Sequence, residues 1–235
     1  MVGENKDPRI LRVDDREIPL VVSRHPRARH MTLRLDGATG DVQLVLPQRT
    51  ALAEGLDFAE ERADWLLDQI EALPERVPFE AGAVVPVLGR DHVIAHHPQA
   101  RRGVWQADGT LWVSGQAEHI ARRVNDYLRA VARREIAARA CAKAARIESR
   151  VRRITLRDMK SRWGSCSTDG RLCFSWRLVL SPEFVLDYVV AHEVAHLREM
   201  NHGRRFWRLT AQLTCEIERA RAWLGDNGDG LLRYG

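Results

Sequence analysis

The sequence predicts an α+β protein of 235 residues, in which a β-rich N-terminal part precedes a helix-rich part. Apolar and polar residues alternate in short runs through most of the first 115 residues, as half-buried strands require, with one helical segment among them. Beyond that point apolar residues recur at helical spacing, around a group of short strand-like runs. We therefore expect a β-rich region with one helix at 1–115, a compact lobe at 116–225 and a flexible tail at 226–235.

The N-terminal region opens with a small antiparallel sheet over residues 9–47, formed by the runs IPLVVS, HMTLRL and DVQLVLP. The sequence DGATGD within it is typical of a hairpin turn. A helix is expected from Thr50 to Leu73, because its apolar residues keep helical spacing and Pro74 and Pro78 close it. A second β patch follows in AVVPVLGRDHVIAHH and GVWQADGTLWVSG, and no internal repeat is visible.

The second lobe begins with a long helix, which is expected to run to about Ser149. Three short β candidates follow in RRITLRDM, SRWGSCS and RLCFSWRLVL. Ser181, Pro182 and Glu183 then predict a helix start, with serine as the N-cap, proline in the first position and an acid in the first turn. This last helix should extend to about Met200.

Composition indicates a soluble protein of the reducing cytoplasm. No apolar run approaches the roughly 18 residues that a membrane span needs, so no membrane partner is expected. The start MVGENKDPRI lacks the apolar region and cleavage site of a secretory signal. The four cysteines have irregular spacing and form no CxxC pair, which argues against a zinc ribbon and a disulfide framework.

Basic residues are concentrated in one segment of a chain whose net charge is +5. Between Glu118 and Arg153 there are 11 Lys or Arg residues against 4 Asp or Glu. One interpretation is a surface for a nucleic acid or nucleotide partner. The other is an arginine-rich, solvated helix face, which we favour because neither interleaved aromatic residues nor a nucleic-acid motif accompanies the charge.

The motif HEVAH at residues 192–196 lies on the predicted helix that starts at Pro182. Residues four apart share one helix face, so His192 and His196 can present their imidazoles to one metal ion. Glu193 lies one position further round the helix, where it can reach a water without binding the metal. Such a motif also arises by chance, but unpaired histidines beside an apolar helix face would be costly to bury without a ligand.

A catalytic zinc ion usually has three protein ligands and an open position for water. The residues offer three candidates for the third ligand, which are His202, Glu199 and Glu216. His202 can join only if the helix ends before it, and Asn201 is a residue that can end a helix in the left-handed conformation.

The segment from DMKSRWGSC to NHGRRFW resembles the signature region of the YgjP-like metallopeptidase family, relatives of the SprT-like and Wss-like zinc proteases. The resemblance is carried by SRWGSC, FSWRLV, DYVVAHEVAHL and NHGRRFW, and it extends more weakly over roughly Ile18 to Leu224. It implies a Zn²⁺ cofactor held by His192, His196 and His202, with Glu193 as the catalytic base. It also implies that residues 116–225 form a zincin-like, minigluzincin-type catalytic lobe with a long helix, a small sheet and the HExxH helix.

The resemblance further implies a substrate-binding edge strand beside the motif helix. Its residues would be Arg162, Trp163, Gly164, Ser165 and Cys166. The same residues also have plainer interpretations, with Trp163 and Phe206 as core residues and Cys166 as an inert thiol. Tyr188, Arg204 and Arg205 are weak candidates for stabilising the oxyanion.

The expected activity is metal-assisted hydrolysis of a peptide or protein substrate, with Glu193 as general base. One alternative is a metal-dependent nucleoside triphosphate pyrophosphatase, because a metal site can also serve phosphoanhydride hydrolysis and the chain is basic. No glycine-rich phosphate loop supports it. A second alternative is a nonenzymatic module in which the metal is structural and the surface binds DNA or protein.

Overall fold

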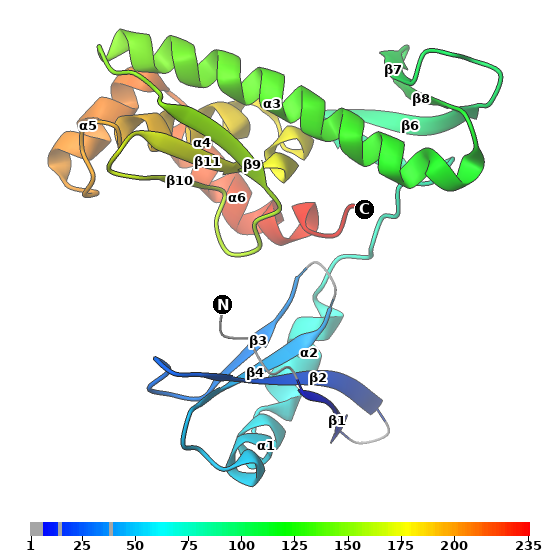
Figure 1. Cartoon of the computed structure of the whole chain (residues 1–235), viewed down its shortest axis with the longest axis vertical. Helices are drawn as coiled ribbons and strands as arrows, with labels where there is room; N and C mark the ends of the chain where they lie inside the picture. Colours follow the sequence, from blue (N-terminus) through cyan, green and yellow to red (C-terminus); the bar gives the residue numbers. More distant parts are fainter. Residues whose placement is uncertain (1–6, 14–15, 38–39) are drawn as a thin grey trace. The chain divides into compact units, whose positions relative to one another are not determined.

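The computed structural model describes residues 7–13, 16–37 and 40–235, and its contacts divide the chain into two compact units, with the boundary in the sequence between Glu75 and Arg76. Both units contain sheets and helices, and the β-rich part comes first, so the predicted α+β class is confirmed (Figure 1). The division lies earlier than the expected boundary at residue 115, because the second β patch packs within the second unit.

The first unit is a four-stranded sheet with two helices. Its strands are β1 (Asp7–Val13), β2 (Arg16–His25), β3 (Thr32–Leu35) and β4 (Val42–Pro47), in the order β1-β2-β4-β3. The pair β2–β4 is parallel and the other two pairs are antiparallel. The expected hairpin therefore joins β3 to β4, although Ala38 and Thr39 of its DGATGD turn lie outside the described residues.

The single helix expected from Thr50 to Leu73 is instead two helices, α1 (Leu52–Glu60) and α2 (Ala63–Glu71). The interruption lies at Arg62, whose backbone angles are φ −112° and ψ 16°. The Arg62 guanidinium donates to the Phe58 carbonyl, and the Arg62 amide bonds to Ala59. The side chain thus occupies the acceptor that a continuing helix would give to the Arg62 amide.

The second unit begins with β5 (Val84–Val87), β6 (Arg90–His97), β7 (Val104–Ala107) and β8 (Thr110–Ser114), in the order β5-β6-β8-β7. Its central pair is parallel and its outer pairs are antiparallel. This topology is the same as that of the first sheet. The similarity is not visible in the sequence, because the two sheets share a pattern of strand pairing and not a repeated sequence motif.

The remainder of the second unit surrounds the HEVAH helix. A short 3-10 helix η1 (Ala117–His119) leads into α3 (Ile120–Arg146), and the strands β9 (Arg153–Arg157), β10 (Gly164–Cys166) and β11 (Arg171–Ser175) follow. They form a sheet in the order β10-β11-β9. A buried 3-10 helix η2 (Trp176–Leu180) precedes α4 (Glu183–Ala195), α5 (Arg204–Leu213) and α6 (Ile217–Leu231). Figure 1 shows α3 as the long green helix beside α4 and this small sheet.

Three boundaries of the second unit differ from prediction. The residues WRLVL, expected to extend a strand, form η2, where all five are buried. The hydroxyl of Ser181 donates to the Leu178 carbonyl at 2.8 Å rather than capping α4, so Pro182 occupies the N-cap position. Helix α4 ends at Ala195, several residues before Met200.

The predicted flexible tail at 226–235 is instead packed against the unit. Helix α6 continues to Leu231, and both Leu231 and Leu232 are buried. The buried guanidinium of Arg177 donates to the carbonyls of Leu231 and Tyr234 at 3.1 and 2.7 Å. The residues of this segment are mostly polar or glycine, but Leu231 and Leu232 are buried and the distant Arg177 binds two of its carbonyls. Among the described residues, no helix has the length and hydropathy that crossing a membrane demands.

Candidate metal centre

Three histidines converge at the end of α4. The ring centroids of His192 and His196 lie 5.0 Å apart, and those of His202 lie 4.9 and 4.7 Å from them. One nitrogen from each ring lies within 4.8 Å of the other two. His196 is buried and His202 is exposed, so the cluster opens to solvent on the His202 side.

The early end of α4 allows His202 to reach the other two rings. The chain leaves the helix after Ala195, and the Nδ1 of His196 bonds to the carbonyl of Glu199 at 3.0 Å, which holds the turn that follows. Asn201 is not among the residues with positive φ, so the expected left-handed stop at Asn201 is wrong. The helix is ended instead by the turn that the His196 ring helps to fix.

The other two candidates for a third ligand lie elsewhere. Glu199 contributes its backbone carbonyl to His196, and its carboxylate is outside the cluster. Glu216 precedes α6, and its carboxylate pairs with Arg219 at 3.5 Å. The structure therefore brings His202, and neither glutamate, to His192 and His196.

The protonation of the rings suits a cation between them. Because the His196 Nδ1 faces a carbonyl acceptor, it carries the proton and leaves Nε2 with a free lone pair. The Nε2 atoms of His192 and His202 are 3.0 Å apart, and the buried Nδ1 of His192 has no hydrogen-bond partner among the described residues. Burial lowers the pKa of His192 to about 4 and also lowers that of His196, which favours the neutral form of both imidazoles.

Phe206 forms the floor of the cluster. Its ring centroid lies 4.8, 4.5 and 4.7 Å from those of His192, His196 and His202, and the side chain is fully buried. The sequence supported core packing for Phe206 but gave no reason to place it against the histidines. No spacing in the sequence indicated this contact, because His202 precedes α5 and Phe206 lies in the first turn of that helix.

Glu193 is buried beside the cluster and faces strand β10. A Cβ built on Gly164 would lie 2.6 Å from both the Cγ and the Oε1 of Glu193. Only glycine therefore allows the strand to approach this closely. Burial raises the pKa of Glu193 to about 7, and the nearby Arg162 guanidinium opposes this rise.

The predicted substrate segment, residues 162–166, includes an edge strand of the three-stranded sheet. Strand β10 pairs with β11 on one side, and the Ser175 amide donates to the carbonyl of Trp163 at 2.9 Å. The Trp163 ring approaches Gly228 of α6 and is only partly buried. Burial raises the pKa of the Cys166 thiol to about 11, which agrees with an inert thiol.

The candidate oxyanion residues differ in their placement. Tyr188 is buried, and its ring lies edge-on to His192 at 6.0 Å. Arg204 and Arg205 are exposed at the start of α5. Tyr188 is thus the member of this group with a contact to the histidine cluster.

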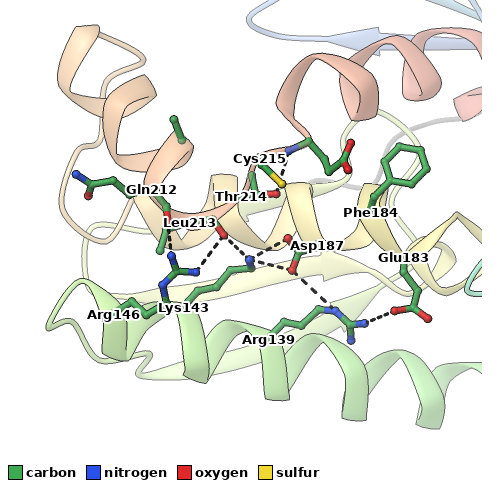
Figure 2. Close-up of a pocket in the computed structure, with 12 residues that line it drawn as sticks. Arg139, Lys143, Arg146, Glu183, Phe184, Asp187, Gln212, Leu213, Thr214 and Cys215 are labelled. Atoms are coloured by element: carbon green, nitrogen blue, oxygen red, sulfur yellow. Dashed lines mark hydrogen bonds and ion pairs between the residues drawn. The ribbon is translucent and has the colours of Figure 1, made fainter.

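Several basic residues of α3 are engaged within the protein rather than free for a partner. Figure 2 shows them along a hollow of about 600 Å³ between α3, the first turns of α4 and the α5–α6 connection. The ammonium of Lys143 donates to Asp187 at 2.9 Å and to the Leu213 carbonyl at 2.7 Å. Arg146 donates to the Gln212 carbonyl, and Arg139 pairs with acids. The arrangement gives no support to a nucleic-acid surface.

Comparisons with known proteins identify the family. The family model described as YgjP-like, metallopeptidase domain matches residues 29–227, which include the histidine cluster, Glu193 and strand β10. No curated protein and no solved structure matched the chain. Because the family model covers most of the 235 residues, the chain belongs to the YgjP-like metallopeptidase family.

Proposed function

We propose that the protein is a zinc-dependent peptidase in which His192, His196 and His202 hold the metal and Glu193 is the general base. The convergence of three imidazoles beside a buried carboxylate carries the proposal. Metallopeptidase activity is the activity of the family, and these residues supply the chemistry that it requires.

The donor set fits zinc. Imidazole nitrogen is a preferred zinc ligand, and nitrogens around a tetrahedral zinc ion lie roughly 3.3 Å apart for Zn–N distances of about 2.0–2.1 Å. The observed 3.0 Å between the Nε2 atoms of His192 and His202 is near this separation. Three protein ligands leave the fourth position for water, as in other catalytic zinc sites.

Glu193 would carry the proton during hydrolysis. A bound zinc ion would supply a Lewis acid that acidifies water and polarises the scissile carbonyl. The Glu193 carboxylate, adjacent in sequence to His192, would accept the proton of the attacking water and deliver it to the leaving amine. Its burial and its close approach to Gly164 restrict the positions that this carboxylate can adopt.

The free edge of β10 would bind the substrate backbone. An extended peptide can add as a strand to a sheet edge, where main-chain hydrogen bonds hold it without regard to side chains. Because Gly164 in β10 contacts Glu193, a peptide on this edge would pass beside the base. Such binding favours unfolded or locally extended polypeptides as substrates.

The test uses the zinc-loaded protein and its Glu193→Gln variant on a casein-like unfolded protein and, separately, on the four nucleoside triphosphates. We expect casein cleavage by the parent protein and a loss of at least about a hundredfold in the variant, at equal zinc content. Glu199→Gln is the matched control, because its carboxylate lies outside the cluster. Glu193-dependent release of pyrophosphate without peptide cleavage would overturn the proposal.

A further inference from the structure

The first unit contains a hollow of about 470 Å³ on one face of its sheet. Strands β2, β3 and β4 supply its floor. The alternation of the strands places Leu20, Val22 and Leu44 in the core, and turns the intervening residues to the other face. The strand register aligns these intervening residues in two rows across the three strands. The rows are Val21–Gln43–Arg34 and Ser23–Val45–Thr32.

The connection from β2 to β3 supplies the wall. It contributes Ala28, Arg29 and His30 to the lining, and His25 at the end of β2 also lines the hollow. The backbone amide of Arg27 donates to the Nδ1 of His25 at 3.2 Å, so the proton of the neutral His25 ring is on Nε2. The His25 ring therefore retains one N–H donor that this turn does not use.

Every polar side chain that lines the hollow can donate a hydrogen bond. These side chains come from two arginines, two histidines, a serine, a threonine and a glutamine, and the described lining contains no carboxylate. The sequence has four arginines and no acid between Ile18 and Leu35, whereas α1 and α2, which cover the core face, carry many acids. Two of these arginines, Arg29 and Arg34, line the hollow without an acid among the lining residues, and the hollow therefore favours an anion.

We propose that this hollow binds an acidic segment of a polypeptide. Its volume lies within the range of about 300–1,000 Å³ that is typical of ligand sites, and planar guanidinium groups suit carboxylates. Strand β3, which carries Thr32 and Arg34, is an edge strand, so an extended peptide can pair with it. The described residues of the lining include no Phe, Tyr or Trp on which a nucleobase would stack, which disfavours single-stranded nucleic acid.

This inference rests on the proposed function in one respect, since a peptidase has a use for a second contact with its substrate. The hollow would bind an acidic segment of a substrate protein, and another segment of that substrate would reach the histidine cluster. The test measures binding rather than cleavage, so that failure of the peptidase proposal and failure of this one can be told apart.

The experiment measures fluorescence anisotropy of a labelled peptide with alternating Asp and Glu residues, added to full-length Glu193→Gln protein. The variant Arg29→Gln/Arg34→Gln removes both cations of the hollow. Arg27→Gln/Arg49→Gln removes the same charge from exposed positions of the same unit that do not line the hollow. We expect at least about tenfold weaker binding for the first pair and less than about twofold for the second.

Three further probes identify the ligand class: a peptide with Asn and Gln in place of the acids, a single-stranded oligonucleotide and inorganic phosphate. The proposal requires the neutral peptide to bind weakly and the oligonucleotide and phosphate to compete poorly with the acidic peptide. Equal weakening by both pairs of substitutions would show that the peptide binds by general charge attraction, and this result would overturn the proposal. Arginine-dependent binding of the oligonucleotide or phosphate in preference to the peptide would overturn it as well.

Discussion

Gly164 lies against the carboxyl group of Glu193, so closely that a Cβ on Gly164 would come within 2.6 Å of the Glu193 Oε1. An edge strand and the HEVAH helix therefore meet at a glycine and a glutamate. The contact links the proposed path of a substrate backbone to the proposed base, and it gives a test that leaves every proposed metal ligand in place.

Gly164→Ala should displace Glu193 and reduce peptide hydrolysis by at least about tenfold, because a misplaced base loses its reach to the attacking water. Zinc content should remain near one per chain, since the three histidines are unchanged. Steady-state cleavage of casein and metal analysis are the two measurements. Gly225→Ala is the control, because nothing lies within 4 Å of a Cβ at that position. Full activity in Gly164→Ala would show that the contact does not position Glu193.

Substitution of His202 should strongly weaken zinc binding. The Nε2 atom of His202 lies 3.0 Å from that of His192, whereas the Glu216 carboxylate is paired with Arg219. We expect His202→Ala to bind zinc at least about a hundredfold more weakly, and Glu216→Ala to bind it like the parent. Competition with a chromophoric chelator measures both affinities. Unchanged affinity in His202→Ala, or a selective loss in Glu216→Ala, would contradict the three-histidine assignment.

Local spacing was sufficient to predict much of the fold and the first two histidines. The alternation of β2 and β4 and the i, i+4 relation of His192 and His196 are properties of short segments, and the structure retains both. The contact of Phe206 with the three histidines was not predictable from local spacing. Phe206 reaches them because α4 ends early, and the end depends on a bond between the His196 ring and the Glu199 carbonyl.

The packed C-terminus illustrates a second limit. Residues 226–235 have the composition of a loose tail, but Arg177, more than fifty positions earlier, donates to the carbonyls of Leu231 and Tyr234. Hydrogen bonds across such a separation leave no periodicity for sequence reasoning to detect. The same holds for the hollow in the first unit, whose rows exist only once the register of β2, β3 and β4 is known.

Lys143 ties three helices together. It is almost fully buried in α3, and it donates to Asp187 of α4 and to the Leu213 carbonyl at the end of α5 (Figure 2). Lys143→Met should destabilise the second unit by about 1–3 kcal/mol, because the Leu213 carbonyl loses its donor at 2.7 Å and keeps only the longer bond from Arg146 at 3.5 Å. Arg122→Met, which removes an exposed pair with Asp126, should cost less than about 0.5 kcal/mol.

Urea unfolding followed by tryptophan fluorescence measures the effect of Lys143→Met, because six of the seven tryptophans belong to the second unit. A urea midpoint of Lys143→Met equal to that of Arg122→Met would refute the stabilising role proposed for Lys143. Since α5 follows directly on His202 and Gly203, we also expect weaker zinc binding in Lys143→Met than in Arg122→Met.

The pair of Asp158 and Arg177 should make the stability of the second unit depend on acidity. Burial alone would raise the pKa of Asp158, but the hydrogen bonds and charge of Arg177 outweigh it, and the pKa is lowered overall. A carboxylate whose pKa is lower in the folded state adds stability above its unfolded pKa and loses it as the pH falls through the folded value. The contribution should therefore be complete at pH 7 and decline below about pH 5. Asp158→Asn should lower the urea midpoint at pH 7 and narrow the difference between the midpoints at pH 7 and pH 4. The exposed Asp226→Asn should change neither quantity, and the same narrowing in that control would assign the effect to net charge instead of the pair of Asp158 and Arg177.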